Sequence, residues 1–149
     1  MEINFIDVKK QYNKMKSEID SAVLSVMSKG QFIMGQDVFD LEYNLSKYTE
    51  SAYAISCSSG TDALLLALMS LNIRPGDEII TTPFTFISTV EVILLLKAKP
   101  VFVDIREDTF NIDEELIERA VTKKTKAIIP VSLFGQTSDM ESVNSIAKK

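Results

Sequence analysis

Apolar residues recur at intervals of three and four positions in the first third of the chain. The apolar residues between Lys9 and Lys29 are Tyr12, Met15, Ile19, Val23, Val26 and Met27. This spacing predicts an amphipathic helix that ends at Gly30. A second helical pattern runs from about Asp37 to Tyr48. We therefore expect two helices at the start of the chain.

The pattern changes from Ala52 onward, where short strand-like runs alternate with helical runs. The strand-like runs read AYAIS, EIITTP, PVFVDI and KAIIPVSL, and the helical runs read TDALLLALMSL, STVEVILLLK, DEELIERAV and DMESVNSIAKK. Such alternation is typical of βαβ units, whose buried parallel strands are apolar on both faces. The pattern predicts an α/β fold with a mainly parallel sheet.

Turn and cap residues support this division. Pro75-Gly76 is a turn signal ahead of the strand predicted at 78–82, and Asn111 with Glu114 resembles a capping box for the next helix. Ligands of parallel sheets bind beyond the carboxyl ends of the strands. The candidate loops are therefore 57–62, 82–88, 104–113 and 133–138.

Composition limits the class of protein. With 149 residues, 46% of them hydrophobic, and no repeat, linker or low-complexity segment, we expect one α/β domain over 1–149. Its N-terminal helices are expected at about 9–49 and its α/β region at about 52–149.

The net charge is −5, and no block of basic residues is present, which argues against a nucleic-acid partner. No apolar run could span a membrane and no signal peptide is evident, so we expect a soluble cytoplasmic protein.

Two residue types that carry much of enzyme chemistry are almost missing. The chain has no histidine and a single cysteine, Cys57. Zinc sites and Ser-His or Cys-His catalysis are therefore not expected, and we predict no metal site.

The stretch SCSSGTDAL, at the junction of a strand-like and a helical run, has two interpretations. Ser59 can cap the helix with Asp62 at its third position. Alternatively, the backbone amides of Gly60 and Thr61, with the Thr61 hydroxyl, hold a phosphate at the positive end of the helix. The stretch matches neither the nucleotide P-loop nor the dinucleotide-binding motif.

The loop TTPFTFISTVE carries two aromatic residues at the end of a predicted strand. Phe84 and Phe86 could stack on a planar ligand held by the preceding loop, or they could belong to the core.

Four motifs, in this order, resemble the DegT/StrS-type aminotransferases over essentially the whole chain: SSGTDALLLAL, RPGDEIITTPFTFISTVE, AKPVFVDIREDTFNID and TKAIIPVSLFGQTSDM. The resemblance implies a pyridoxal-phosphate enzyme of fold type I. The chain would be the N-terminal part of its large domain, a three-layer α/β/α structure. It also implies a homodimer with active sites at the subunit interface. The implied reaction transfers an amino group from glutamate or glutamine to a nucleotide-linked keto-sugar, as in cell-surface polysaccharide synthesis.

The resemblance also assigns roles to single residues. It implies that Gly60 and Thr61 contact the cofactor phosphate and that Phe86 stacks on the pyridine ring, with Phe84 as second choice. Phe32 and Gly35 fall where the family approaches the sugar nucleotide, although Gly35 could equally be a glycine that ends a helix.

Two further positions carry weaker expectations. Gln136 follows a predicted strand and could face the site, or it could be an ordinary polar loop residue. Asp104 ends a strand, where a carboxylate could pair with the pyridine nitrogen. In the family that aspartate lies beyond the point matching Lys149, so we interpret Asp104 as a turn residue.

The family is well over twice as long as this chain. The resemblance places its Schiff-base lysine and its C-terminal part beyond Lys149, so we expect no catalytic residue here. The following lysines are expected to be surface charges: Lys97, Lys99, Lys123, Lys124, Lys126, Lys148 and Lys149. The chain is then the N-terminal part of a sugar-nucleotide aminotransferase or a non-catalytic module that retains the dimer-forming surface. A fold-type-I enzyme with an amino-acid substrate is a third, weaker alternative.

Overall fold

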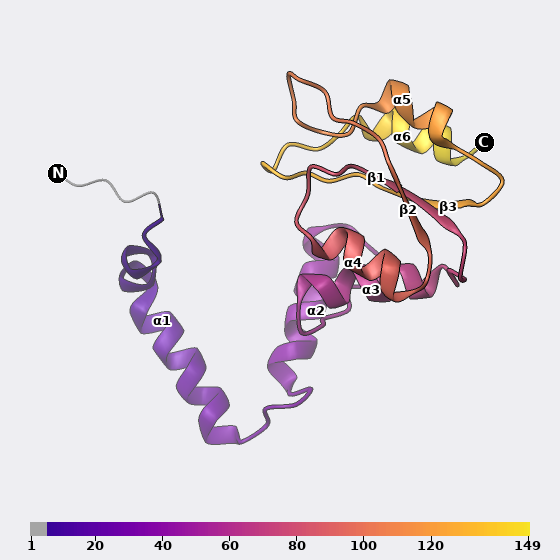
Figure 1. Cartoon of the computed structure of the whole chain (residues 1–149). Helices are drawn as coiled ribbons and strands as arrows, with labels where there is room; N and C mark the ends of the chain where they lie inside the picture. The colour runs from indigo at the N-terminus through magenta and orange to yellow at the C-terminus, as the bar shows by residue number, and fades with distance from the viewer. Residues whose placement is uncertain (1–5) are drawn as a thin grey trace. The chain divides into compact units, whose positions relative to one another are not determined.

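A computed structural model describes residues 6–149 (Figure 1). The chain divides into two compact units, one up to Ser56 and one from Cys57 to Lys149.

The first unit contains two helices with well-defined ends. Helix α1 spans Val8–Lys29, and the carboxylate of Asp7 accepts the N–H of Lys10 at 2.9 Å as its cap. The helix ends at Gly30, whose φ of 65° is the left-handed conformation that glycine adopts most easily. Helix α2 spans Gln36–Tyr48. The predictions at 9–29 and 37–48 are confirmed.

Neither α1 nor α2 has a buried residue within the described chain. Their large apolar side chains are exposed instead, including Met15, Val23, Leu24, Met27, Phe39, Leu41 and Tyr43. An amphipathic helix obtains most of its stability from burying its apolar face. These two faces are therefore uncovered in the described residues. No helix among those residues has the length and apolar character needed to cross a membrane.

The run AYAIS, predicted as strand-like, forms no strand in the described chain. A strand needs a neighbour for its backbone hydrogen bonds, and this segment has none among the described residues. Its apolar Tyr53 and Ile55 are exposed. The segment is instead tied to α2, because the Glu42 carboxylate accepts both the N–H and the hydroxyl of Ser56 at 2.7 Å. These bonds lower the pKa of Glu42.

The second unit is built around a parallel sheet of three strands in the order β2-β1-β3. The strands are β1 (Glu78–Thr81), β2 (Lys99–Phe102) and β3 (Thr125–Ile129). Helices α4 (Ser88–Leu95) and α5 (Glu114–Ala120) connect them in turn. Helix α3 (Gly60–Ser70) precedes the sheet and α6 (Met140–Ala147) follows it. The predicted α/β class is confirmed.

Two adjacent residues of β1 anchor two separate cores. Ile79 is fully buried with Leu68, Val92, Ile93 and Ala98, which come mainly from α3 and α4. Ile80 is fully buried with Val103, Ile112, Ile117 and Val143, which include residues of α5 and α6. Successive strand residues point to opposite faces, and Figure 1 shows the two helix pairs on opposite sides of the sheet. The three-layer α/β/α arrangement is therefore observed.

The predicted capping box at Asn111 is wrong. Helix α5 is capped by Asp113, whose carboxylate accepts the N–H of Glu115 at 3.0 Å. Ile112 is buried and bridges Ile105, so the chain is still extended at the position where Asn111 would have to cap. Asn111 is buried instead, and its amide donates to the carbonyl of Thr137 at 3.1 Å.

Glu78 joins three elements at the amino end of the sheet. Its side chain is nearly buried at the start of β1. It accepts the Thr122 hydroxyl at 2.6 Å and the Lys99 ammonium at 3.1 Å. These contacts, the Thr122 bond most strongly, lower the pKa of Glu78. The carboxylate thus links β1 with β2 and with the segment before β3.

We predict that Glu78→Gln lowers the free energy of unfolding at neutral pH. Because the folded-state pKa of Glu78 is depressed, its contribution is present above the unfolded-state pKa of about 4.3 and is lost as pH falls through the folded value. Urea unfolding of parent and variant from pH 7 to pH 3 should show a gap that closes in acid. The control is Glu107→Gln, an exposed carboxylate. A gap that stays constant over this range contradicts the assignment.

Candidate functional site

Among the described residues, the loop before α3 leaves two backbone amides without a hydrogen-bond acceptor. Ser59 caps the helix, because its hydroxyl oxygen accepts the N–H of Asp62 at 3.1 Å and its carbonyl accepts the N–H of Ala63 at 3.0 Å. The capping prediction is confirmed. The N–H groups of Gly60 and Thr61 occupy the first two helical positions, where no intrahelical acceptor exists. Two donors therefore face outward at the positive end of the helix.

Space around Gly60 is open. A Cβ built on this residue would meet no atom of the described chain within 4 Å, and its φ is not in the left-handed region. Neither packing nor backbone conformation therefore requires a glycine at this position. The neighbouring Thr61 is half-buried, and its hydroxyl makes no hydrogen bond within residues 6–149. The arrangement fits an external anion that approaches the two amides and this hydroxyl.

A carboxylate lies in the same turn. Asp62 accepts the hydroxyls of Ser58 and Ser59, the second at 3.0 Å. These bonds, that of Ser58 first, lower the pKa of Asp62 and keep it ionised at neutral pH. The charge favours the helix but repels an anion at the neighbouring amides. Binding of an anion there therefore works against this repulsion.

The two phenylalanines of the next loop, Phe84 and Phe86, have different surroundings. The Phe84 ring packs 6.1 Å from each of Phe110 and Phe134, whose centroids are 5.9 Å apart. The Phe86 ring has no aromatic partner among the described residues, and 69% of the residue is exposed. Phe84 therefore belongs to a small aromatic cluster, whereas Phe86 presents a free ring face.

The sequence interpretation missed two members of this cluster, Phe110 and Phe134. Each of the three loops that follow a strand contributes one ring to the cluster. A phenylalanine in every one of these loops is the sequence signal that could have indicated the cluster. Phe110 adopts a left-handed φ of 59°, which is uncommon for a bulky residue. The cluster therefore holds the ends of these loops together at the carboxyl edge of the sheet.

Asp104 and Gln136 occupy different surroundings. The Asp104 carboxylate accepts the N–H of Ile105 at 2.8 Å, which is turn chemistry as expected. Gln136 is exposed and lines a hollow of about 270 Å³ together with Arg106 and Ser138. The Ser138 hydroxyl is buried without a hydrogen-bond partner in the described chain.

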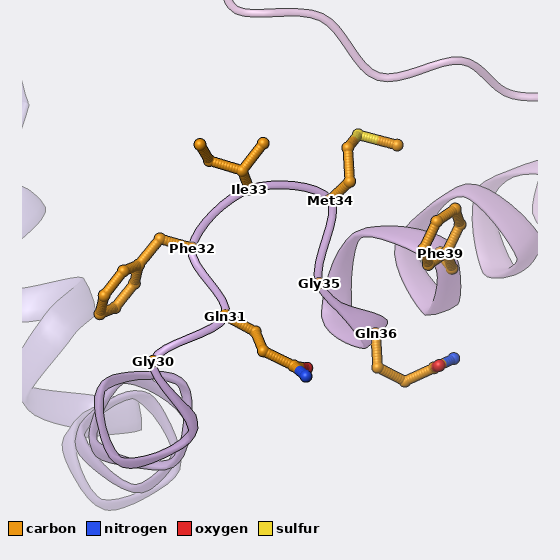
Figure 2. Close-up of a pocket in the computed structure, with 8 residues that line it drawn as sticks. All are labelled: Gly30, Gln31, Phe32, Ile33, Met34, Gly35, Gln36 and Phe39. Atoms are coloured by element: carbon orange, nitrogen blue, oxygen red, sulfur yellow. The ribbon is translucent and has the colours of Figure 1, made fainter.

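In the first unit, the loop between α1 and α2 forms a hollow of about 520 Å³. Figure 2 shows Phe32, Ile33 and Met34 pointing outward from this loop, with Gln31 inside the bend. Gly35 is the N-cap residue before α2 and does not end a helix, which corrects that alternative. A Cβ on Gly35 would lie 2.6 Å from the carbonyl oxygen of Gln31, so the close backbone approach alone explains the glycine.

The predicted site residues come from separate segments of the described chain. No hydrogen bond or aromatic ring pair of the described residues joins Gly60 or Thr61 to Phe86. Phe32 and Gly35 belong to the other compact unit. The structure therefore supplies separate elements of a site: two free amides, an exposed ring and an apolar loop.

The lysines of the second unit lie away from the carboxyl-end loops. Parallel strands place all their amino ends at one edge, and helices that connect them end at that same edge. The lysines at the starts of β2 and β3 or at the end of α6 are Lys97, Lys99, Lys123, Lys124, Lys126, Lys148 and Lys149. Two of them form ion pairs, Lys99 with Glu78 and Lys149 with Glu118.

Comparison with known proteins gives consistent matches along the chain. The UDP-2-acetamido-2-deoxy-3-oxo-D-glucuronate aminotransferase of Pseudomonas aeruginosa is 48% identical over 147 residues, covering 99% of this chain and 41% of that protein. The crystal structure of DesV from S. venezuelae superposes with a TM-score of 0.95 at 35% identity, covering 98% of this chain and 39% of that chain. NtdA from Bacillus subtilis, solved with bound cofactor PMP, gives 0.93 at 36% identity, covering 99% and 34%.

The chain thus spans about two fifths of the length of the first two proteins. Residues 13–149 match the model of a single family. On this match, the chain belongs to the DegT/DnrJ/EryC1/StrS aminotransferase family.

Proposed function

We propose that this chain is the N-terminal part of a pyridoxal-phosphate-dependent aminotransferase that acts on a nucleotide-linked keto-sugar. The observation that carries the proposal is the pair of free amides at Gly60 and Thr61 beside open space. Family membership supports it, as does the similarity to an aminotransferase named for a UDP-linked sugar.

The residues at the start of α3 fit the phosphate of this cofactor. The amides of Gly60 and Thr61 and the Thr61 hydroxyl are donors, and a phosphate dianion offers only acceptors. Glycine allows the group to approach the backbone closely. The cap at Ser59 remains in place meanwhile, because it uses the amides of Asp62 and Ala63 instead.

The exposed ring of Phe86 is the proposed stacking face for the pyridine ring. Phe84 is less suited to this role, since its ring already packs against Phe110 and Phe134. When bound, the cofactor supplies an electron sink and carries the amino group. The chain's own residues bind its phosphate and orient its ring.

The remaining parts of the proposed enzyme follow the family resemblance. Phe32 and Gly35 would approach the sugar nucleotide and Gln136 would face the site. Glutamate or glutamine would be the amino donor, and the protein would act as a cytoplasmic homodimer. The resemblance places the lysine that binds the cofactor outside this chain. The lysines of the second unit, which lie toward the opposite edge of the sheet, are consistent with that placement.

The position of those lysines also supports a second candidate. In this candidate the chain is a non-catalytic folded module of the same family, which retains the dimer-forming surface and does not transfer amino groups. The two candidates differ in whether a longer protein that contains this chain transfers an amino group.

We expect the full protein, supplied with pyridoxal phosphate and glutamate or glutamine, to convert a UDP-linked 3-keto-sugar into the corresponding amino sugar. The 149-residue chain alone should give no product. Mass spectrometry of the nucleotide sugar measures both. If the full protein transfers no amino group from either donor to UDP- or dTDP-linked keto-sugars, the proposed function is wrong.

We expect Thr61→Ala to weaken binding of pyridoxal phosphate to the full protein by about tenfold or more, because hydrogen bonds to charged groups contribute roughly 1.5 to 3 kcal/mol. Thr61→Ser keeps the hydroxyl and should bind nearly as well as the parent. Isothermal titration calorimetry measures the affinities. Equal affinities for the parent and the alanine variant would remove Thr61 from the site.

We expect Asp62→Asn to tighten binding of the same cofactor by about three- to tenfold at low salt, because it removes a negative charge beside the phosphate. The gain should shrink as salt screens the charge. Asp37→Asn, in the first turn of α2, is the matched control and should change nothing. Unchanged or weaker binding by Asp62→Asn would show that the phosphate does not lie at this helix end.

A further inference from the structure

Within residues 6–149, no side chain caps the start of helix α4. Its N-cap residue is Ile87, whose side chain cannot accept a hydrogen bond. The first bonds of the helix are made by the backbone: the N–H of Thr89 donates to the carbonyl of Phe86 at 3.2 Å, and that of Val90 to the carbonyl of Ile87 at 3.0 Å. The entry of the chain into α4 therefore lacks the usual side-chain anchor.

A pair of threonine hydroxyls supplies such an anchor. The Oγ1 atoms of Thr85 and Thr89 are 2.8 Å apart and share a hydrogen bond. Thr89 is 5% exposed and Thr85 is half-buried, so water competes little for this bond. The bond connects the residue just before Phe86 with the first turn of the helix just after it.

The other side of the loop is also fixed. The buried Thr82 hydroxyl accepts the N–H of Phe84 at 3.2 Å, and the N–H of Thr85 donates to the carbonyl of Pro83 at 3.1 Å. The backbone is therefore bonded on both sides of Phe86.

The Phe86 ring depends on these bonds because side-chain packing holds it weakly. The residue is 69% exposed and makes no aromatic contact within the described chain, in contrast to Phe84. Its orientation must follow from the backbone that carries it. A ring held in place before a ligand arrives loses less entropy on binding than one that must first be ordered.

We propose that the Thr85–Thr89 hydroxyl pair is a positioning element that holds Phe86 ready to stack on the pyridine ring of the cofactor. This inference rests on the proposed function, since it takes Phe86 as the stacking residue. Thr85 and Thr89 act through Phe86 and do not contact the cofactor themselves.

The test uses the full protein and the variants Thr85→Val, Thr89→Val and the double variant, which keep the side-chain shape and remove the hydroxyls. Pyridoxal phosphate affinity and the visible circular dichroism of the saturated protein are measured. Each single variant should lose affinity by about three- to tenfold, the usual range for one hydrogen bond. The dichroism, which reports the fixed environment of the ring, should also fall.

Two further results are expected. The double variant should be no weaker than the weaker single variant, because either substitution already breaks the shared bond. Thr89→Ser keeps the hydroxyl and should restore affinity and dichroism. Thr49→Val is the matched control, since Thr49 shares a similar hydroxyl pair with Ser51 at 2.9 Å in the first unit. It should leave both measurements unchanged.

Phe86→Leu separates this inference from the proposed function. If Phe86→Leu changes neither affinity nor dichroism, Phe86 is not the stacking residue and the positioning role is wrong with it, whereas amino transfer by the full protein tests the proposed function separately. If it lowers both while the valine variants match the parent, or if the losses of the two valine variants add, only the positioning role is wrong. If the valine variants lose affinity while Phe86→Leu does not, the hydroxyls act by another route and the inference is also overturned.

Discussion

The second unit depends on burial of the central strand from both sides. The four residues of β1 are all buried, and the two isoleucines in the middle of the strand enter different cores. A strand in this position must satisfy all of its backbone groups through its neighbours, which β2 and β3 provide along its length. Helices then cover the two faces, and each crossover brings its loop to the same carboxyl edge. Apart from the free amides at the start of α3, the candidate site residues of this unit come from loops that the sheet places at this edge.

The sequence SCSSGTDAL predicts either a helix cap or an anion site. In the structure they are compatible, because they use different amides of the same helix. Ser59 satisfies the third and fourth amides through its side chain and carbonyl, while the first two remain free at Gly60 and Thr61. The same turn also contains the Asp62 charge, which stabilises the helix and opposes an anion. Helix stability and anion affinity are thus partly in conflict within four residues.

Much of the fold could be predicted from periodicity and from turn residues. Both N-terminal helices, the alternation of strands and helices, and the cap at Ser59 depend on local patterns, and the structure has them. The strand predicted for AYAIS is wrong because a strand needs a neighbouring strand for its hydrogen bonds, and local sequence does not show whether one is present. The capping box predicted at Asn111 is wrong because Ile112 is buried and bridged to Ile105, so the chain is still extended after Asn111.

The site was predictable only in part, for a similar reason. The free amides of Gly60 and Thr61 follow from where α3 begins, which the local sequence predicts. Whether Phe84 or Phe86 is free depends on Phe110 and Phe134, which are 26 and 50 positions from Phe84 and meet it only through the order of the strands. The Thr85–Thr89 bond depends on where α4 begins, which no residue type at the N-cap signals.

The two outer strands of the sheet differ in their capacity to accept another strand. The N–H of Lys99, the first residue of β2, donates to the carbonyl of Asp77, and the N–H of Val103, just after β2, donates to the carbonyl of Thr81 in β1. By alternation along the strand, Pro100 therefore faces outward. Proline has no N–H, and this outer edge therefore lacks a donor that a further strand would need. The outer edge of β3, TKAII, contains no proline and keeps its donors. A further strand could therefore pair with the outer edge of β3 more readily than with the outer edge of β2.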